Sequence, residues 1–286
     1  MAERPDGPDA YSPAEIAARS EEAGVRKAHV DLASKMALSV LGGAFIAVGA
    51  AFATVVWTDP GLGYGAARLL GGVAFSLGLI LVVVGGAELF TGNVLLVVAW
   101  ASRRVTTGAV LRDWAVVYAG NFVGALATAA GVYLSRQWAF GDGRVGAVAL
   151  DLAAAKVGHG FLAAVVLGAF CNALVCLAVW LCLGARTLTD RVLAIVPPIA
   201  AFVALGFEHS VANMYFIPLG LLLAGDPEAL AAIGRAGADL GTLTWTGFLL
   251  RNLLPVTLGN LLGGGLMVGG IYWFIYLRPR AAGPKN

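Results

Sequence analysis

Residues 88–93 read Glu-Leu-Phe-Thr-Gly-Asn, and residues 208–213 read Glu-His-Ser-Val-Ala-Asn. Each segment begins with Glu, ends with Asn and lies inside a long apolar stretch, at a constant offset of 120 residues (88 to 208, 93 to 213). Charged and polar side chains at membrane depth are costly and usually functional. Two such segments at matching places predict a duplicated fold, with a pore or binding site where the segments meet.

The composition around these segments is that of a membrane protein. The 286 residues are 59% hydrophobic and 13% charged, whereas a soluble domain carries about 25% charged residues. A spanning helix needs roughly 20 apolar residues. Uncharged windows of this length lie at 36–58, 114–135, 157–185 and 252–277, and shorter windows join in pairs at 69–87 with 89–102 and at 192–207 with 210–225. The sequence therefore predicts an all-α membrane protein with six transmembrane helices, of which helices two and five are interrupted by the Glu segments.

The distribution of charge predicts the orientation. Six spans place both termini on one side of the membrane, and this side carries 13 of the 19 Lys and Arg residues against 6 on the other. Positive charge accumulates in the cytoplasm, so both termini are expected there. We divide the chain into a cytoplasmic N-terminal segment (1–28), a six-span channel domain (29–278) and a cytoplasmic tail (279–286).

The flanking and connecting segments carry local signals. Residues 1–10 are expected to be disordered. Residues 12–15, Ser-Pro-Ala-Glu, form a capping box that predicts a short helix ending near Gly24. Residues 136–155 are expected to form an outer loop, and so are residues 224–244, in which Asp226 caps a short helix.

The internal similarity extends beyond the Glu segments. Residues 41–45 in the first span resemble residues 167–170 in the fourth, and residues 120–124 in the third resemble residues 259–263 in the sixth. Because three spans is an odd number, the second copy is inverted in the membrane. The sequence thus predicts a 3+3 inverted repeat with its site near the midplane, where the two interruptions meet.

His209 is the strongest candidate for that site. Of the three histidines it alone is predicted in mid-membrane beside a helix interruption. Imidazole can donate a hydrogen bond and can change charge near neutral pH; alternatively, the ring is structural and bonds a neighbouring carbonyl. Thr91 occupies the facing interruption, where its hydroxyl and exposed backbone N–H groups could bind an anion beside His209.

The outer members of the two segments are interpreted as scaffold. Glu88 and Glu208 are expected to accept hydrogen bonds from loop N–H groups or to oppose a cation. Asn93 and Asn213 are expected to hold loop backbone that has lost its helical partners.

Further polar and apolar residues are candidates for the path to the site. Lys156 would begin the fourth span, where it could raise the local anion concentration or simply extend to the interface, and Asn172 lies on the same span. Four apolar residues of the interrupted spans could form a constriction that excludes water, unless they face lipid or core: Phe75, Leu79, Phe90 and Phe202.

Several chemistries find no support in the sequence. There is no Walker motif, dinucleotide fingerprint, metal-ligand cluster or catalytic triad. We therefore expect no cofactor, no metal site and no nucleic-acid partner. Cys171, Cys176 and Cys182 fall in one predicted span and are interpreted as small packing residues.

Five stretches carry a resemblance to a known family: residues 75–81, 88–91, 171–180, 206–214 and 255–260. Over nearly the whole chain, from residues 21–25 to 272–273, the sequence resembles the formate/nitrite transporter family and looks closest to its bacterial formate channels. The form Leu-Phe-Thr-Gly-Asn after Glu88 departs slightly from the formate-channel pattern and leaves the preferred anion open.

The resemblance implies an aquaporin-like fold and a homopentamer in the bacterial inner membrane with one pore per protomer. It implies that His209 and Thr91 form the central polar site between constrictions from Phe75, Leu79, Phe90 and Phe202. It also implies that Lys156, with Asn172 and Glu208, forms an electropositive approach.

The expected function is passage of a small monovalent anion, formate foremost, either as the anion or as formic acid after protonation near His209. A nitrite or hydrosulfide channel is the alternative within the family. A membrane-embedded enzyme using a Glu with His209 is a different class, but neither half supplies a nucleophile, a base and an orienting group. A structural assembly protein would leave the two polar interruptions unexplained.

Overall fold

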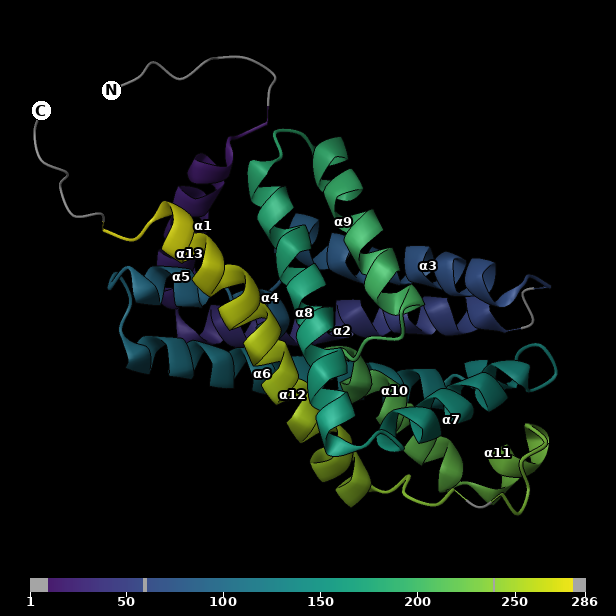
Figure 1. Cartoon of the computed structure of the whole chain (residues 1–286). Coiled ribbons are helices and arrows are strands. Elements are labelled where there is room, and N and C mark those ends of the chain that lie inside the picture. Colours follow the sequence, from purple (N-terminus) through teal and green to yellow (C-terminus); the bar gives the residue numbers. More distant parts are fainter. Residues whose placement is uncertain (1–9, 59–60, 239, 280–286) are drawn as a thin grey trace, which may run out of the picture.

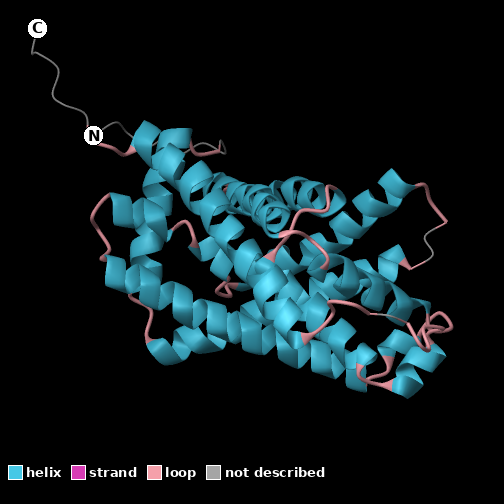
Figure 2. Cartoon of the chain, turned by 60° about the horizontal axis from the view of Figure 1, so that its bottom comes forward, coloured by secondary structure: helices cyan, strands magenta, loops and turns pink. Residues whose placement is uncertain are grey.

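The computed structural model describes residues 10–58, 61–238 and 240–279, and within these ranges the regular secondary structure is entirely helical (Figures 1 and 2). Residues 1–9, most of the proposed disordered segment, and all but residue 279 of the proposed C-terminal tail lie outside the described residues.

Five helical stretches are long and apolar enough to cross a membrane. They are α2 (Leu32–Trp57), α3 (Tyr64–Gly85), α6 (Thr107–Leu134), α8 (Phe161–Gly184) and the run Gly247–Tyr276, which consists of the π-helical η2 (Gly247–Leu253), α12 (Leu254–Leu261), the π-helical η3 (Leu262–Gly270) and α13 (Ile271–Tyr276). Helical backbone satisfies its own hydrogen bonds, which a bilayer requires.

Both predicted interruptions are present. After α3 the chain turns at Gly86 (φ +85°) and resumes in the short helices α4 (Phe90–Asn93) and α5 (Leu96–Ala101). After α9 (Leu188–Ala204) it turns at Gly206 (φ +73°) and resumes in α10 (Ser210–Ala224). Positive φ is strained for residues with a Cβ, so a glycine ends each helix at the point where the polar segment begins.

Small residues allow the long helices to approach closely. A Cβ on Gly49 of α2 would meet the carbonyl oxygen of Phe75 at 2.7 Å, and a Cβ on Gly168 of α8 would meet that of Val256 at the same distance. Close backbone approach through glycine is typical of membrane helices. The glycines of the spans therefore serve packing.

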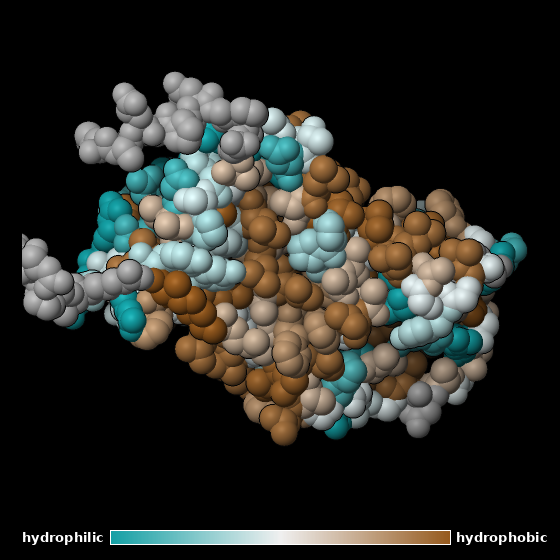
Figure 3. All heavy atoms as spheres, turned by 45° about the horizontal axis from the view of Figure 1, so that its top comes forward, coloured by the Kyte–Doolittle hydropathy of each residue, from teal (hydrophilic) through white to brown (hydrophobic). Residues whose placement is uncertain are grey.

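The remaining helices occupy the two ends of the molecule. α1 (Pro13–Ala28) lies with α5 and α13 at one end, and α7 (Arg144–Val157) and α11 (Pro227–Ala232) lie at the other (Figure 1). One face of the molecule has a broad apolar band between more hydrophilic ends (Figure 3). Exposed side chains such as Leu162 and Leu134, each more than 70% exposed, would be a liability in water but suit a lipid environment.

Three local predictions are corrected and two are confirmed. Residues 136–155 are not a loop, because α7 and the 3₁₀ turn η1 (Gln137–Ala139) occupy most of them. Lys156 consequently lies in the last turn of α7 instead of beginning the fourth span. α1 continues four residues past Gly24, to Ala28, and Gly24 lies inside the helix, buried against Ala99. The capping box at residues 12–15 and the Asp226 cap of α11 are both formed.

Candidate functional site

The two interruptions meet at Thr91 and His209. The Thr91 Oγ1 lies 3.0 Å from the His209 Nε2, although 118 residues separate them in the chain. Thr91 comes from α4 and His209 is the N-cap of α10. Both are almost wholly buried, with 0% and 3% of their surface exposed. The contact that the sequence suggested between the facing segments is therefore made.

Hydrogen bonds define which nitrogen of His209 carries the proton. The Nδ1 accepts the backbone N–H of Ala212 at 3.0 Å, which caps α10. A neutral ring with Nδ1 as acceptor carries its hydrogen on Nε2, so Nε2–H donates to the Thr91 oxygen. The Thr91 hydroxyl hydrogen then remains available for a third group. The pair thus presents a hydrogen-bond donor at the point where the interruptions meet.

Glu208 is enclosed by donors. Its Oε1 lies 2.8 Å from the Lys156 ammonium, and its Oε2 accepts from the side-chain amides of Asn213 at 2.7 Å and Asn252 at 3.2 Å. The His159 Nε2 lies 3.7 Å from the same carboxylate. The side chain of Glu208 is 3% exposed. A buried carboxylate is tolerated when it is paired and hydrogen-bonded in this way.

Glu88 has a matching set of partners. Its Oε2 lies 2.6 Å from the Lys27 ammonium and accepts from the Asn93 amide at 2.7 Å. The same amide donates to Asp113 at 2.8 Å, and Asp113 forms a buried ion pair with Lys35 at 2.5 Å. Both carboxylates of the Glu segments therefore oppose a cation, which was one of the two arrangements that the sequence favoured.

Two other asparagines hold the loop backbone. Asn121 accepts from Phe90 N–H at 2.8 Å and donates to the Glu88 carbonyl at 2.9 Å. Asn260 accepts from Ser210 N–H at 3.0 Å and donates to the Glu208 carbonyl at 3.0 Å. The expectation that Asn93 and Asn213 do this is wrong, because their amides bind side-chain carboxylates and amides instead.

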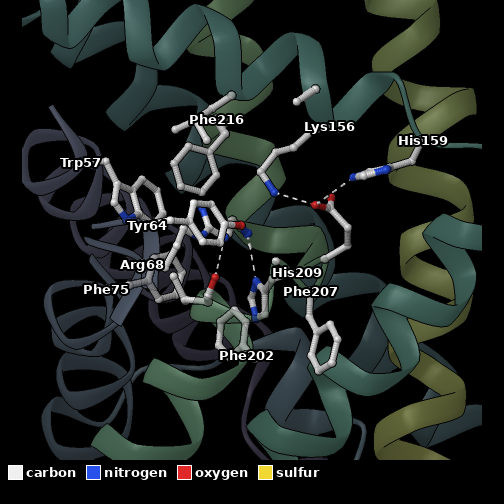
Figure 4. Close-up of a pocket in the computed structure, with 16 residues that line it drawn as sticks. Trp57, Tyr64, Arg68, Phe75, Lys156, His159, Phe202, Phe207, His209 and Phe216 are labelled. Carbon is white, nitrogen blue, oxygen red and sulfur yellow. Dashed lines mark hydrogen bonds and ion pairs between the residues drawn. The ribbon is translucent and has the colours of Figure 1, made fainter. Parts of the chain in front are cut away.

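A cavity of about 340 Å³ opens toward α7, and we call it the α7-side cavity (Figure 4). Arg68, Lys156, His159 and His209 are among its lining residues, with Phe75 and Phe202. The Phe75 and Phe202 rings meet edge to face at 5.6 Å, and Phe202 stacks on His209 at 6.0 Å. Two of the four predicted constriction residues therefore cover the central histidine on this side.

A second cavity of about 340 Å³ opens toward α1, and we call it the α1-side cavity. Leu79 and Leu89 line it together with Gly92, which follows Thr91. Its charged lining residues are Arg19, Lys27, Glu88 and Arg191. The Thr91–His209 contact thus lies between two cavities, each lined by both apolar and charged residues.

Two predicted site residues lie elsewhere. The Phe90 ring packs edge to face on Tyr118 at 4.8 Å and lines a shallow groove with it, while the neighbouring Leu89 lines the α1-side cavity. Asn172 donates to the Asn260 carbonyl at 2.7 Å and lines neither cavity. Phe90 does lie at the interruption, as predicted. Side chains alternate in direction along extended backbone, so Leu89 faces the cavity and Phe90 faces α6.

Sequence reasoning gave no role to seven residues of these networks: Lys27, Lys35, Arg68, Asp113, Asn121, Asn252 and Asn260. Asp113 had a visible signal, since it is an acidic residue directly before an uncharged span. Asn121 and Asn260 lay within the matched stretches 120–124 and 259–263. The three cysteines are free and buried, as expected of packing residues. Cys176 in addition contacts the Thr91 carbonyl at 3.3 Å.

Known proteins resemble this chain over most of its length. The family described as "Formate/nitrite transporter" matches residues 14–274. "Formate channel FocA" of Escherichia coli (strain K12) is 45% identical over 94% of this chain and 96% of that protein. The protein of that name in Haemophilus influenzae is 40% identical over 91% and 93%, and "Probable formate transporter" of Methanothermobacter thermautotrophicus is 36% identical over 93% and 97%.

Solved structures are similar over the same extent. A "Pentameric formate channel with formate bound" superposes with a TM-score of 0.81 at 43% identity, covering 86% of this chain and 98% of that one. An "FNT family ion channel" superposes with a TM-score of 0.77 at 28% identity, covering 91% and 98%. Together with the apolar helices, these matches show a multi-pass membrane protein. The chain belongs to the formate/nitrite transporter family.

Proposed function

We propose that this protein is a channel of the bacterial inner membrane that passes small monovalent anions, with formate as its main substrate. The observation that carries the proposal is the buried Thr91–His209 donor pair between two cavities. The names of the relatives support formate as the anion and a transport function in place of an enzymatic one.

The proposal includes a 3+3 inverted repeat of six spans with an aquaporin-like fold. Matched hydrogen bonds support it: Asn121 and Asn260 each bond an N–H and a carbonyl of one interruption. The cations opposing the two carboxylates come from opposite ends of the molecule, Lys27 from α1 and Lys156 from α7. If the second copy is inverted relative to the first, equivalent cations lie at opposite ends of the molecule.

We further propose that α1 and the C-terminal end of α13 face the cytoplasm. The excess of Lys and Arg on that side supports this orientation. We propose a homopentamer with one pore per protomer, on the strength of the pentameric relative. Residues 1–28 then form a cytoplasmic segment docked on the channel domain of residues 29–278, and residues 279–286 form a tail.

The mechanism begins with a desolvation problem. An anion that enters a passage with apolar walls loses its hydration shell, which costs several kcal/mol unless the protein supplies hydrogen bonds or charge in its place. In our proposal the Thr91 hydroxyl donates to the anion, and its own oxygen accepts from His209 Nε2–H, so the two donors act in series. The Phe75–Phe202 contact on one side and Leu79 with Leu89 on the other keep competing water out.

Proton transfer to formate needs one further event. A neutral His209 has a single ring hydrogen, and losing it to formate would leave an imidazolate. Formic acid can therefore form here only after the ring gains a second proton on Nδ1, which removes the cap on Ala212. The geometry favours anion stabilisation by a neutral ring at neutral pH, with proton coupling confined to acidic conditions.

Formate flux in proteoliposomes at two pH values tests the function and the role of the ring. The wild-type channel should pass formate, and His209→Phe should change the dependence of flux on pH. Unchanged pH dependence in that variant would remove the proton role. Competition by nitrite and hydrosulfide in the same assay ranks the anions, and conversion of substrate without flux would overturn the channel proposal itself.

A further inference from the structure

The cationic side chains of the α7-side cavity differ in how far a neighbouring carboxylate offsets their charge. Lys156 lies 2.8 Å from Glu208, and only 15% and 3% of the two side chains are exposed. A pair this close presents little net charge to an approaching anion, because the carboxylate opposes the field of the ammonium. His159 also faces the Glu208 carboxylate, at 3.7 Å.

Arg68 is differently placed. Its Nη2 donates to the Val203 carbonyl at 2.6 Å, and its Nε makes a longer contact of 3.5 Å to the Ala204 carbonyl. Its guanidinium carbon lies 5.1 Å from the Trp57 ring centre. Among the described residues no carboxylate pairs with it. Carbonyl oxygens and an aromatic face orient a guanidinium without cancelling its charge.

The position of Arg68 places this charge beside the constriction. Val203 and Ala204 end α9, whose negative dipole end favours a cation. The neighbouring Phe202 packs on Phe75, which follows Arg68 by two turns of α3. Figure 4 shows Arg68, Phe75, Phe202 and His209 grouped on one side of the cavity. An anion held by Arg68 is thus next to the aromatic pair that it must pass.

We propose that Arg68 is the anion-collecting residue of the α7-side cavity and that Lys156 serves to neutralise Glu208. The ligand is a small monovalent oxyanion such as a carboxylate, which a guanidinium can bind through its remaining N–H groups. Arg68 also holds the end of α9 and so positions Phe202. This inference rests on the proposed channel function for its substrate, but not for the anion site itself.

The first test is the concentration dependence of formate uptake in proteoliposomes whose α7 side faces the added formate. Arg68→Gln should raise the half-saturating formate concentration about 3- to 10-fold with a smaller change in maximal rate. It should also weaken the dependence of uptake on ionic strength. Arg68→Lys keeps the charge and should retain most of the affinity.

Arg136→Gln is the matched control, because Arg136 lies at the same end, pairs with Glu228 on the surface and does not line the cavity. This variant should behave as wild type. Equal half-saturation in Arg68→Gln and wild type would overturn the proposal. Equal losses of affinity in Arg68→Gln and Arg68→Lys would also overturn the proposal. In that case the charge would make no difference, and only the contacts of Arg68 with the carbonyl oxygens would matter.

The second test needs neither transport nor a variant of Arg68. The fluorescence of Trp57 is obtained as the signal of wild type minus that of Trp57→Phe. Relative to quenching by acrylamide, iodide should quench this fluorescence about 3-fold more strongly than it quenches that of the other six tryptophans. A Trp57 signal quenched no better by iodide than by this neutral quencher would refute the anion site. Quenching without formate uptake would instead refute formate as the substrate and leave the site standing.

Discussion

The two interruptions are built from similar parts but differ in what lies behind them. The amide nitrogens of Asn93 and Asn213 each donate to the carboxylate of their own segment and to one further side chain. Behind Asn93 that side chain is Asp113, paired with Lys35; behind Asn213 it is the neutral Asn252. One interruption therefore rests on a buried ion pair and the other on an amide, so a charged backing is not required for the shape.

The largest effect should come from breaking that ion pair. Lys35→Met leaves a buried carboxylate without its cation and should lower the free energy of unfolding by about 3–5 kcal/mol. Adding Asp113→Asn makes the first interruption resemble the second and should restore most of the loss. Thermal unfolding of the solubilised protein measures both. If Lys35→Met is as stable as wild type, the ion pair contributes nothing. The control is the exposed Arg136–Glu228 pair, whose removal should change the free energy of unfolding by about 0–1 kcal/mol.

The next effect tests whether the backbone scaffolds are equivalent. Asn121→Ala and Asn260→Ala each leave a buried N–H and carbonyl without their side-chain partner, which should lower the free energy of unfolding by about 2–3 kcal/mol. The two losses should agree within about 1 kcal/mol if the interruptions are built alike. Gln137→Ala, in the turn η1 and outside both asparagine networks, is the control. Losses that differ several-fold would show that only one interruption depends on its asparagine.

A smaller effect separates the cap from the donor at His209. Ala212→Pro removes the N–H that His209 Nδ1 accepts, at a position in the first turn of α10 where proline is tolerated. Loss of the cap should lower stability by about 0.5–2 kcal/mol. Because Nδ1 is then free to take a proton, the midpoint of formate flux against pH should move upward. A midpoint that stays in place would mean that the cap does not hold the ring neutral. Val211→Ala, which changes the neighbouring side chain but leaves the Ala212 N–H in place, is the control.

The smallest effect lies beyond the second interruption, at Asp226. Hydrogen bonds from Tyr133 and from the first amides of α11 hold the pKa of this carboxyl below its usual 3.8. Because the folded-state pKa is lowered, the stabilisation is present above pH 3.8 and is lost as pH falls through the lower folded value. Hydrogen exchange of residues 228–232 should rise in that range in wild type and be already raised in Asp226→Ala, which removes the capping oxygen. Exchange unaffected by the substitution would show that the cap is not made. Arg235→Gln, on the same outer segment but outside the cap, should exchange over residues 228–232 as wild type does.

Much of the site could be predicted from the sequence, since an apolar background makes every polar residue conspicuous. The two segments and the meeting of Thr91 with His209 follow from that contrast, and a cation facing each Glu was one of the two arrangements that it favoured. The scaffold asparagines were harder to predict. The sequence matches residues 120–124 with residues 259–263, but the pattern does not contain the fold that brings Asn121 and Asn260 against the loop backbone.

Other features depend on three-dimensional detail that a sequence pattern does not contain. The direction of the Phe90 side chain follows from loop geometry. Residues predicted as a loop form the helix α7 because the alanine-rich residues 147–155 pack against α10. Lys27 was counted only among the positive charges of the N-terminal side, and Lys156 was predicted at the approach to the site but at the start of the fourth span. Only the tertiary arrangement brings their ammonium groups to carboxylates 61 and 52 residues away.

Those two lysines link the ends of the molecule to its middle. Each carboxylate lies in an interruption, but its counter-charge comes from a helix at the end of the molecule, α1 or α7. Removing either helix from its place would leave a buried carboxylate without its cation. The seating of the two end helices and the shape of the two interruptions are therefore energetically coupled.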